Sequence, residues 1–164
     1  MSFIAEEVFE MAEQLERNGR EFYRAAALGS EGDAVELFNR LADMEKRHED
    51  IFHGMRNERT PEESIPSTAD PDDLANKYLR SMVEGKIFHL AGDPKKKLSG
   101  FKSPEEILKY AISLEKEAIA FYVGIKDSMS READRDRIDE IISEEKSHVV
   151  DLTEQLNNYQ KGEK

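Results

Sequence analysis

Two short segments, Glu45-Lys46-Arg47-His48 and Glu145-Lys146-Ser147-His148, repeat the pattern Glu-Lys-x-His about 100 positions apart. A glutamate and a histidine three residues apart lie on the same face of an α-helix. Each motif interrupts a stripe of apolar residues at helical spacing, with Leu41 before the first and Ile141 before the second. The repeat therefore predicts two inward helix faces that each carry one carboxylate and one imidazole.

A second repeat precedes each of these motifs. Leu15-Glu16 is followed by Phe22-Tyr23, and Leu114-Glu115 is followed by Phe121-Tyr122 at the same spacing. The order of the two patterns is the same in both halves of the chain. Each half is therefore interpreted as one copy of a two-helix hairpin.

Helical periodicity covers four long segments, at about 3–28, 33–57, 104–129 and 131–159. The first and last pairs are joined by short breaks, which favour antiparallel hairpins. Between the pairs lies a crossover of about 58–103, with a short helix expected from Pro71 to about Leu90. Short, long and short connections are typical of the ferritin-like topology. We expect an all-α, ferritin-like antiparallel four-helix bundle that forms one domain over residues 1–164.

Local signals mark the start of the third long helix. Ser103 can cap it, Pro104 suits its first turn, and Glu106 completes a capping box. The basic run 95–97 is flanked by glycine and proline and is interpreted as a solvated loop, with phosphate or partner binding as the alternative.

Composition excludes several classes of function. The net charge is −12, which disfavours nucleic acid and anionic membranes as partners. The absence of cysteine excludes disulfide scaffolds, zinc fingers, iron–sulfur clusters and cysteine nucleophiles. The sequence has no signal-peptide pattern and no apolar run near the roughly 20 residues that span a bilayer. A cytoplasmic protein is expected.

All four inward stripes carry a glutamate near the middle, and two of them add a histidine one turn later. Four carboxylates at one level of a core would repel one another and would be costly to bury without compensation. No lysine or arginine lies on these stripes, whereas two divalent cations would balance the charge. Mixed oxygen and imidazole ligands suit iron or manganese, with zinc as an alternative. The candidate metal ligands are Glu16, Glu45, His48, Glu115, Glu145 and His148.

Residues near these ligands have two interpretations each. Tyr23 and Tyr122 either pack in the core or donate hydrogen bonds to the site. Gly19 and Ala118, one turn after the first and third glutamates, either allow close helix packing or leave room for metal or oxidant.

Other polar residues are interpreted as lying outside the site. His53 is expected to be solvated and His89 to lie in the crossover, packed or exposed. Glu49 and Glu144 adjoin the ligands but are interpreted as solvated, and Glu49 is the better candidate to support the site. The remaining charges assigned to the solvated face are Arg17, Arg20, Lys46 and Lys146.

The paired Leu-Glu-x-x-x-x-x-Phe-Tyr and Glu-Lys-x-His motifs resemble those of the rubrerythrin-like branch of the ferritin superfamily. The resemblance covers nearly the whole chain apart from the crossover. It implies that Glu45 and Glu145 bridge two metals. It implies further that Glu16 and Glu115 are terminal ligands and that His48 and His148 bind one metal each.

Two features depart from that family's pattern. Rubrerythrins proper carry a rubredoxin domain with four cysteines, whereas this chain has none, so an external electron-donor protein is expected. Rubrerythrins proper also have an extra carboxylate one turn after the third helical glutamate. That position is Ala118 here, and its counterpart is Gly19. The resulting six-ligand set is closer to the symmetric sites of bacterioferritin-type proteins.

Three functions follow from these observations as hypotheses. The leading one is a di-iron oxidoreductase that reduces peroxide or dioxygen. The second is ferritin-like iron handling or ferroxidase activity, and the third is a structural module that the metal stabilises without catalysis. A homodimer is expected, because proteins of this class commonly pair.

Overall fold

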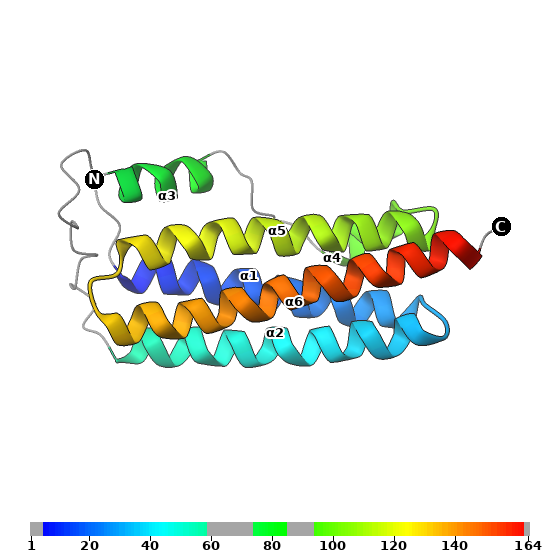
Figure 1. The fold of residues 1–164 in the computed structure, drawn as a ribbon, viewed down its shortest axis with the longest axis horizontal. Coiled ribbons are helices and arrows are strands. Elements are labelled where there is room, and N and C mark those ends of the chain that lie inside the picture. Colours follow the sequence, from blue (N-terminus) through cyan, green and yellow to red (C-terminus); the bar gives the residue numbers. More distant parts are fainter. Residues whose placement is uncertain (1–4, 59–73, 85–93, 163–164) are drawn as a thin grey trace.

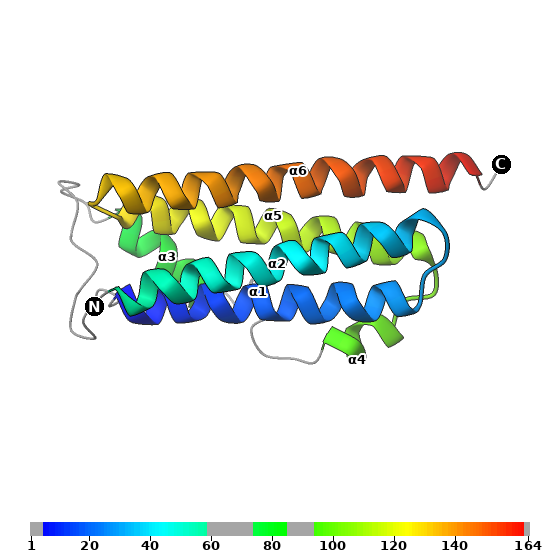
Figure 2. The same cartoon turned by 90° about the horizontal axis from the view of Figure 1, so that it is seen from below.

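Four long helices run side by side in the computed structural model, which describes residues 5–58, 74–84 and 94–162 (Figure 1). They are α1 (Ala5–Leu28), α2 (Asp33–Asn57), α5 (Pro104–Ser128) and α6 (Glu132–Gly162). Two shorter helices, α3 (Leu74–Glu84) and α4 (Pro94–Ser99), pack on the outside of the bundle, α3 against α5 and α4 against α1 (Figures 1 and 2). The described ranges contain no strand, which confirms the all-α prediction.

The four long helices form two hairpins. α1 packs chiefly against α2, and α5 packs chiefly against α6. Contacts of α1 with α5 and of α2 with α6 close the bundle (Figure 2). The α1–α2 connection lies at one end of the bundle and the α5–α6 connection at the other (Figure 1). The sequence motifs of the two halves meet across the middle of the bundle.

The start of α5 follows the predicted signals with one difference. Ser103 is extended, and its Oγ accepts a hydrogen bond of 3.3 Å from the backbone N–H of Glu106. The Glu106 carboxylate accepts from the backbone N–H of Lys102 at 2.5 Å, one residue earlier than in a capping box. Pro104 occupies the first turn, where its missing N–H leaves no bond unmade.

The crossover contains more helix than the sequence indicated. The predicted short helix corresponds to α3, and the parts of the prediction at 71–73 and 85–90 lie outside the described residues. The interpretation of the run 95–97 as a loop is wrong, because these residues lie in α4. Pro94 occupies the first position of α4, where proline is favoured. Lys96 and Lys97 are exposed, as expected.

The ends of the long helices differ from the predictions by a few residues. α5 ends at Ser128, because Met129 takes an extended conformation. α6 begins at Glu132 and continues to Gly162, three residues past the predicted end. No proline or glycine precedes Gly162 in this helix, so nothing in the sequence stops it earlier.

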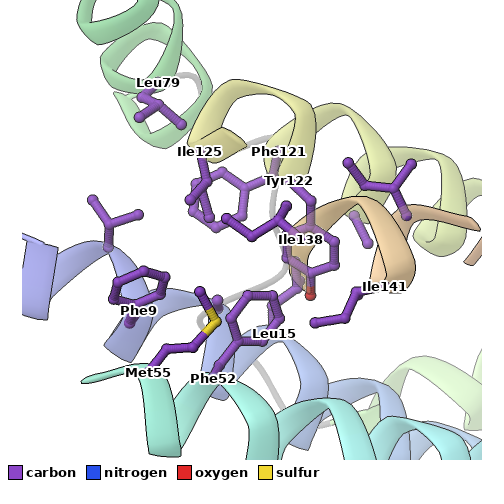
Figure 3. Packing of buried hydrophobic residues seen from close by; sticks show 14 of the residues in the cluster. Phe9, Leu15, Phe52, Met55, Leu79, Phe121, Tyr122, Ile125, Ile138 and Ile141 are labelled. Atoms are coloured by element: carbon purple, nitrogen blue, oxygen red, sulfur yellow. The ribbon is translucent and has the colours of Figure 1, made fainter. Parts of the chain in front are cut away.

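Two apolar clusters fill the bundle, one on each side of its middle. The first includes Phe9, Phe52, Ile125 and Ile138, and Figure 3 shows their side chains pointing toward one another from α1, α2, α5 and α6. The second is built by the opposite ends of the same four helices. The candidate ligands lie between the two clusters along every helix, so each stripe runs from apolar to polar and back to apolar.

The outer faces of the bundle carry its charge. Arg24 pairs with Asp43 between α1 and α2, and Lys126 pairs with Asp139 between α5 and α6, both at 2.8 Å. Such exposed pairs each contribute about 0–1 kcal/mol. Among the helices that the structure describes, none is both long enough and apolar enough to cross a membrane.

Candidate metal centre

All six candidate ligands converge at one level in the middle of the bundle, and all are buried. Their donor atoms form two groups of four in which all atoms lie within 4.8 Å of one another. Glu45 and Glu145 belong to both groups. The first group adds Glu16 and His48, and the second adds Glu115 and His148. This sharing is the pattern expected of a two-metal site with two bridging carboxylates.

The two histidines present the same ring nitrogen to the carboxylates. Nδ1 of His48 lies 2.9 Å from Glu145 and 3.6 Å from Glu16. Nδ1 of His148 lies 3.2 Å from Glu145, 3.6 Å from Glu115 and 3.7 Å from Glu45. The ring centroids are 5.9 Å apart. Nδ1 is therefore the nitrogen of each imidazole that is placed to bind a metal.

Two buried tyrosines cross-link the halves of the site. The hydroxyl of Tyr23 donates to Glu115, and the hydroxyl of Tyr122 donates to Glu16, each at 2.5 Å. Both rings also belong to the apolar clusters. The two interpretations made from sequence are therefore compatible, since each ring packs in the core while its hydroxyl reaches the site.

The buried carboxylates have strongly shifted pKa values. Burial, together with the nearby charge of Glu145, raises the pKa of Glu16 and Glu45 well above the usual range. The same two causes raise the pKa of Glu115 to about 8. Glu145 is the exception: burial opposes its ionisation, but hydrogen bonds with Glu115, His148 and His48 hold its pKa well below the usual value.

The pKa values of the two histidines are raised, whereas burial lowers the pKa of an isolated histidine. Burial alone would lower their pKa, but hydrogen bonds and charges from the carboxylates outweigh it. Glu145 raises the pKa of His48 to about 9, and Glu115 with Glu145 raises that of His148 to about 10. Without metal, protons thus compensate the buried negative charge at neutral pH.

The residues fit two divalent cations. Oε2 of Glu16 and Oε1 of Glu45 are buried and have no hydrogen-bond partner. Unpaired buried carboxylate oxygens are rare because each is costly. Metal ions would take these lone pairs and replace the protons that the metal-free site holds. Four carboxylates and two imidazoles form a donor set suited to iron or manganese.

Gly19 and Ala118 differ in what they leave beside the site. A Cβ on Gly19 would lie 3.0 Å from Oε2 of Glu45, so glycine leaves room for this shared carboxylate. Ala118 is buried and carries the methyl group that Gly19 lacks. The three atoms nearest to such a Cβ all belong to the Glu45 side chain, so the space at Gly19 serves the site.

Two interpretations of neighbouring acids from the sequence are wrong. Glu144 is only partly exposed, and its Oε2 lies 2.5 Å from Nε2 of His48. Glu49 is buried rather than solvated and pairs with Arg17 and Arg20. Glu144, not Glu49, is thus the acid that contacts a candidate ligand. Glu144 lies next to its motif on α6, and its side chain reaches across to His48 on α2.

The remaining histidines stand as follows. His53 is exposed as expected, and its Nδ1 lies 2.7 Å from the buried Glu13, a contact that the sequence did not indicate. His89 lies outside the described residues.

One feature of the sequence could have indicated the contact of Glu144 with His48. The residue before the Glu-Lys-x-His motif is Glu144 in α6 but Met44 in α2, so the two copies of the repeat differ at this position.

The sequence profile of the Rubrerythrin family matches residues 7–156. The chain belongs to the rubrerythrin family. This match spans both hairpins and the crossover, so the two motifs in each half belong to one rubrerythrin unit.

Two further similarities agree with this assignment. A candidate ferritin-like diiron-carboxylate protein from Thermotoga maritima has a similar crystal structure, with a TM-score of 0.75 and 24% identity over 96% of this chain and 97% of that one. It supports the ferritin-like fold. An uncharacterised protein from Archaeoglobus fulgidus is 46% identical over 57 residues, which are 33% of this chain and 84% of that protein. The buried carboxylate–histidine cluster of this rubrerythrin-family chain fits di-iron binding.

Proposed function

We propose that this protein is a di-iron oxidoreductase that reduces hydrogen peroxide or dioxygen. One observation carries the proposal: two groups of four buried ligand atoms share Glu45 and Glu145. In this proposal Glu16 and His48 hold one ion, and Glu115 and His148 hold the other. The two shared glutamates keep the ions close enough to act on one small molecule.

The surrounding residues exclude water and hold protons. Apolar clusters cover the site at both ends, so a bound oxidant would meet few competing water molecules. Burial, with the neighbouring Glu115 and Glu16 respectively, raises the pKa of Tyr23 and Tyr122 well above 10. Both hydroxyls therefore keep their protons at neutral pH and orient Glu115 and Glu16 by hydrogen bonding.

The chemistry needs electrons that the side chains alone do not provide. Reduction of hydrogen peroxide to two water molecules consumes two electrons and two protons. Two ferrous ions held in this site would supply one electron each. Because metal binding displaces the protons of the carboxylates and imidazoles, the two protons would come from solvent. The hydroxyls of Tyr23 and Tyr122 stay protonated and hydrogen-bond the terminal carboxylates Glu115 and Glu16.

Continuous turnover requires a partner that returns the electrons. The 164 residues contain no cysteine that could carry electrons to the site, so an external electron-donor protein is part of the proposal. A homodimer in the cytoplasm, without nucleic acid or membrane partners, completes it. Light scattering of the purified protein measures the oligomeric state directly.

The test is stoichiometric oxidation of the ferrous protein. The protein is loaded anaerobically with ferrous ions and mixed with one equivalent of hydrogen peroxide per pair of ions. We expect all of the ferrous iron to be oxidised, with one hydrogen peroxide consumed per pair of ions. The variant Glu145→Ala, which lacks a shared ligand, is expected to lose the reaction, whereas the exposed Glu132→Ala on the same helix is expected to keep it. Ferrous protein that peroxide does not oxidise would contradict the proposal.

Ferroxidase activity is the second candidate, and one observation favours it. Ala118 stands at the position of the extra carboxylate of rubrerythrins proper, and its counterpart is Gly19, so each half has the same three ligand residues. In an iron-handling protein, excess ferrous iron and dioxygen would load many more ions than two per chain. Retention of two ions per chain favours the oxidoreductase, and metal binding without any oxidation favours a structural role.

A further inference from the structure

The two histidines of the site have unlike surroundings, although the motifs that carry them repeat. Nε2 of His48 lies 2.5 Å from Oε2 of Glu144, on the side of the ring away from the site. Nδ1 of His148 faces the site in the same way. Within the described ranges, however, Nε2 of His148 has no hydrogen-bond partner.

Glu144 is held in place from the surface. Its Oε1 accepts a hydrogen bond of 2.8 Å from Nη1 of Arg47, which lies next to His48 on α2. The Arg47 side chain is 55% exposed, the Glu144 side chain 28%, and the His48 side chain 0%. A chain of polar contacts therefore runs from solvent through Glu144 to the back of one histidine.

The sequence repeat explains why the other half lacks this arrangement. The residue before the Glu-Lys-x-His motif is Glu144 in α6 but Met44 in α2. The residue before the histidine is Arg47 in α2 but Ser147 in α6. A thioether is only a weak acceptor, so Met44 cannot replace a carboxylate in this role.

A second difference falls in the same half of the site. Gly19, on the helix that carries Glu16, leaves room that a methyl group would take from Glu45, whereas Ala118 carries that methyl group. The half with Glu16 and His48 therefore has both the additional acceptor and the additional room.

A carboxylate behind an imidazole changes how that imidazole binds metal. By accepting the Nε2–H proton, it selects the tautomer in which the Nδ1 lone pair is free, and it makes the ring a stronger ligand. Such partners typically change metal affinity by about 10–100-fold. For His148, no such group in the described ranges fixes the tautomer.

We propose that the two metal positions are unequal, and that Glu144 is the positioning residue that makes the position of Glu16 and His48 the tighter one, filled first. The inference rests on the proposed two-metal function and concerns the order in which the site fills. It applies to any divalent ion that accepts imidazole and carboxylate ligands.

The test is a titration of the metal-free protein with Co²⁺, in which calorimetry and visible absorption monitor binding. Two binding steps are expected, with affinities separated by about tenfold or more. Glu144→Leu removes the acceptor and is expected to weaken the tight step by about 10–100-fold, leaving the weak step unchanged. Glu144→Gln keeps a neutral acceptor and should fall between Glu144→Leu and the original protein.

Two further variants separate a positioning role from a general effect on the helix. Glu140→Leu makes the same change at an exposed position one turn earlier on α6, and both steps should remain as they were. Met44→Glu supplies the missing carboxylate to the other half and is expected to strengthen the weak step. Thermal unfolding of each metal-free variant checks that the bundle still forms.

A spectroscopic signature identifies the histidine involved. In the Co²⁺ protein, one paramagnetically shifted imidazole N–H proton should exchange slowly with solvent because Glu144 accepts it. This signal is expected to disappear in Glu144→Leu and to persist in Glu140→Leu.

The outcomes distinguish this inference from the function on which it rests. Equal affinities in the original protein, or equal weakening of both steps by Glu144→Leu, would overturn the inequality. Ordered binding of two ions without oxidation by peroxide would support the inequality and remove the oxidoreductase proposal. Failure to bind Co²⁺ near two ions per chain would overturn both.

Discussion

The hydroxyl of Tyr23 on α1 donates a hydrogen bond to Glu115 on α5, and the repeat reproduces this contact between Tyr122 and Glu16. Each hairpin thereby supplies the hydrogen-bond donor for the terminal carboxylate of the other. Both bonds are buried, so solvent cannot replace either donor. The two halves of the bundle are joined through the site as well as through the apolar clusters.

Removing one of these donors should destabilise the metal-free protein. Tyr23→Phe leaves Oε1 of Glu115 without its tyrosine donor in a buried position, which is expected to lower the free energy of unfolding by about 1–3 kcal/mol. Urea denaturation of the metal-free protein measures this. Tyr78→Phe is the control, because the Tyr78 hydroxyl bonds the carbonyl of Ala120 at an exposed position. A loss for Tyr23→Phe no larger than for Tyr78→Phe would show that the buried bond contributes little.

The shared glutamates should matter for both ions, and the terminal glutamates for one. Glu145→Ala removes an oxygen donor from both groups and is expected to abolish stoichiometric binding of two ions. Glu115→Ala affects one group and is expected to leave about one ion bound per chain. Elemental analysis after dialysis against Mn²⁺ counts the ions. Identical losses in the two variants would argue against the shared arrangement.

The metal-free protein should become less stable as the pH rises from 6.5 to about 9. The folded pKa values of Glu115 (about 8), His48 (about 9) and His148 (about 10) lie above their ordinary values of 4.5, 6.5 and 6.5. A group with a raised folded pKa stabilises the fold while protonated, and this contribution is lost as the pH rises through the folded pKa. The pKa of Glu145 is lowered instead, so its contribution to stability is lost only at acidic pH, as the pH falls below the ordinary value of 4.5.

Thermal unfolding of the metal-free and metal-loaded proteins tests this pH dependence. The unfolding temperature of the metal-free protein is expected to decrease as the pH rises from 6.5 to about 9. The gap to the metal-loaded protein should widen, because metal binding requires deprotonated ligands and strengthens with pH. A metal-free midpoint that rises over this range would contradict the protonated state of the site.

The space beside Gly19 should be needed for metal binding rather than for folding. Gly19→Ala places a Cβ 3.0 Å from Oε2 of Glu45, so the carboxylate must move by a few tenths of an ångström. Metal affinity is expected to fall by about tenfold, in the range found for changes next to metal ligands. Gly54→Ala on α2 is the control, since its Cβ would meet nothing within 4 Å.

The control variant Gly54→Ala is itself expected to change the stability of the protein. Glycine inside a helix is destabilising by about 0.5–1 kcal/mol relative to alanine, so Gly54→Ala should stabilise the protein and leave metal affinity unchanged. Calorimetric titration with Mn²⁺ measures both variants. Equal affinities for Gly19→Ala and Gly54→Ala would show that Glu45 does not depend on this space.

The fold and the six converging residues could be predicted because they depend on helical periodicity and on a repeat. An interrupted apolar stripe identifies the inward face, and the Glu-x-x-His spacing places two side chains at one level of it. The short helix α4 could not be predicted, because a run of lysines near a proline is equally typical of a loop. Contacts between helices were also beyond the sequence: the approach of Glu144 to His48 depends on how α6 packs beside α2.

The burial of Glu49 illustrates the same limit. Its neighbours in sequence are charged, and it follows a ligand histidine by one position, which indicates a solvated place on the helix. In the bundle, Arg17 and Arg20 from α1 cover it and neutralise it. Periodicity within α2 carries no information about which cations an adjacent helix presents, so only the packed structure identifies this pair.

The most direct test of the two-metal site is an anaerobic titration of the metal-free protein with ferrous ions, with bound iron counted per chain. Two ions per chain in the original protein, and loss of this stoichiometry in Glu145→Ala, are expected from the two groups that share Glu45 and Glu145. Binding of no iron, or the same amount of iron in both proteins, would contradict a di-iron centre at these residues.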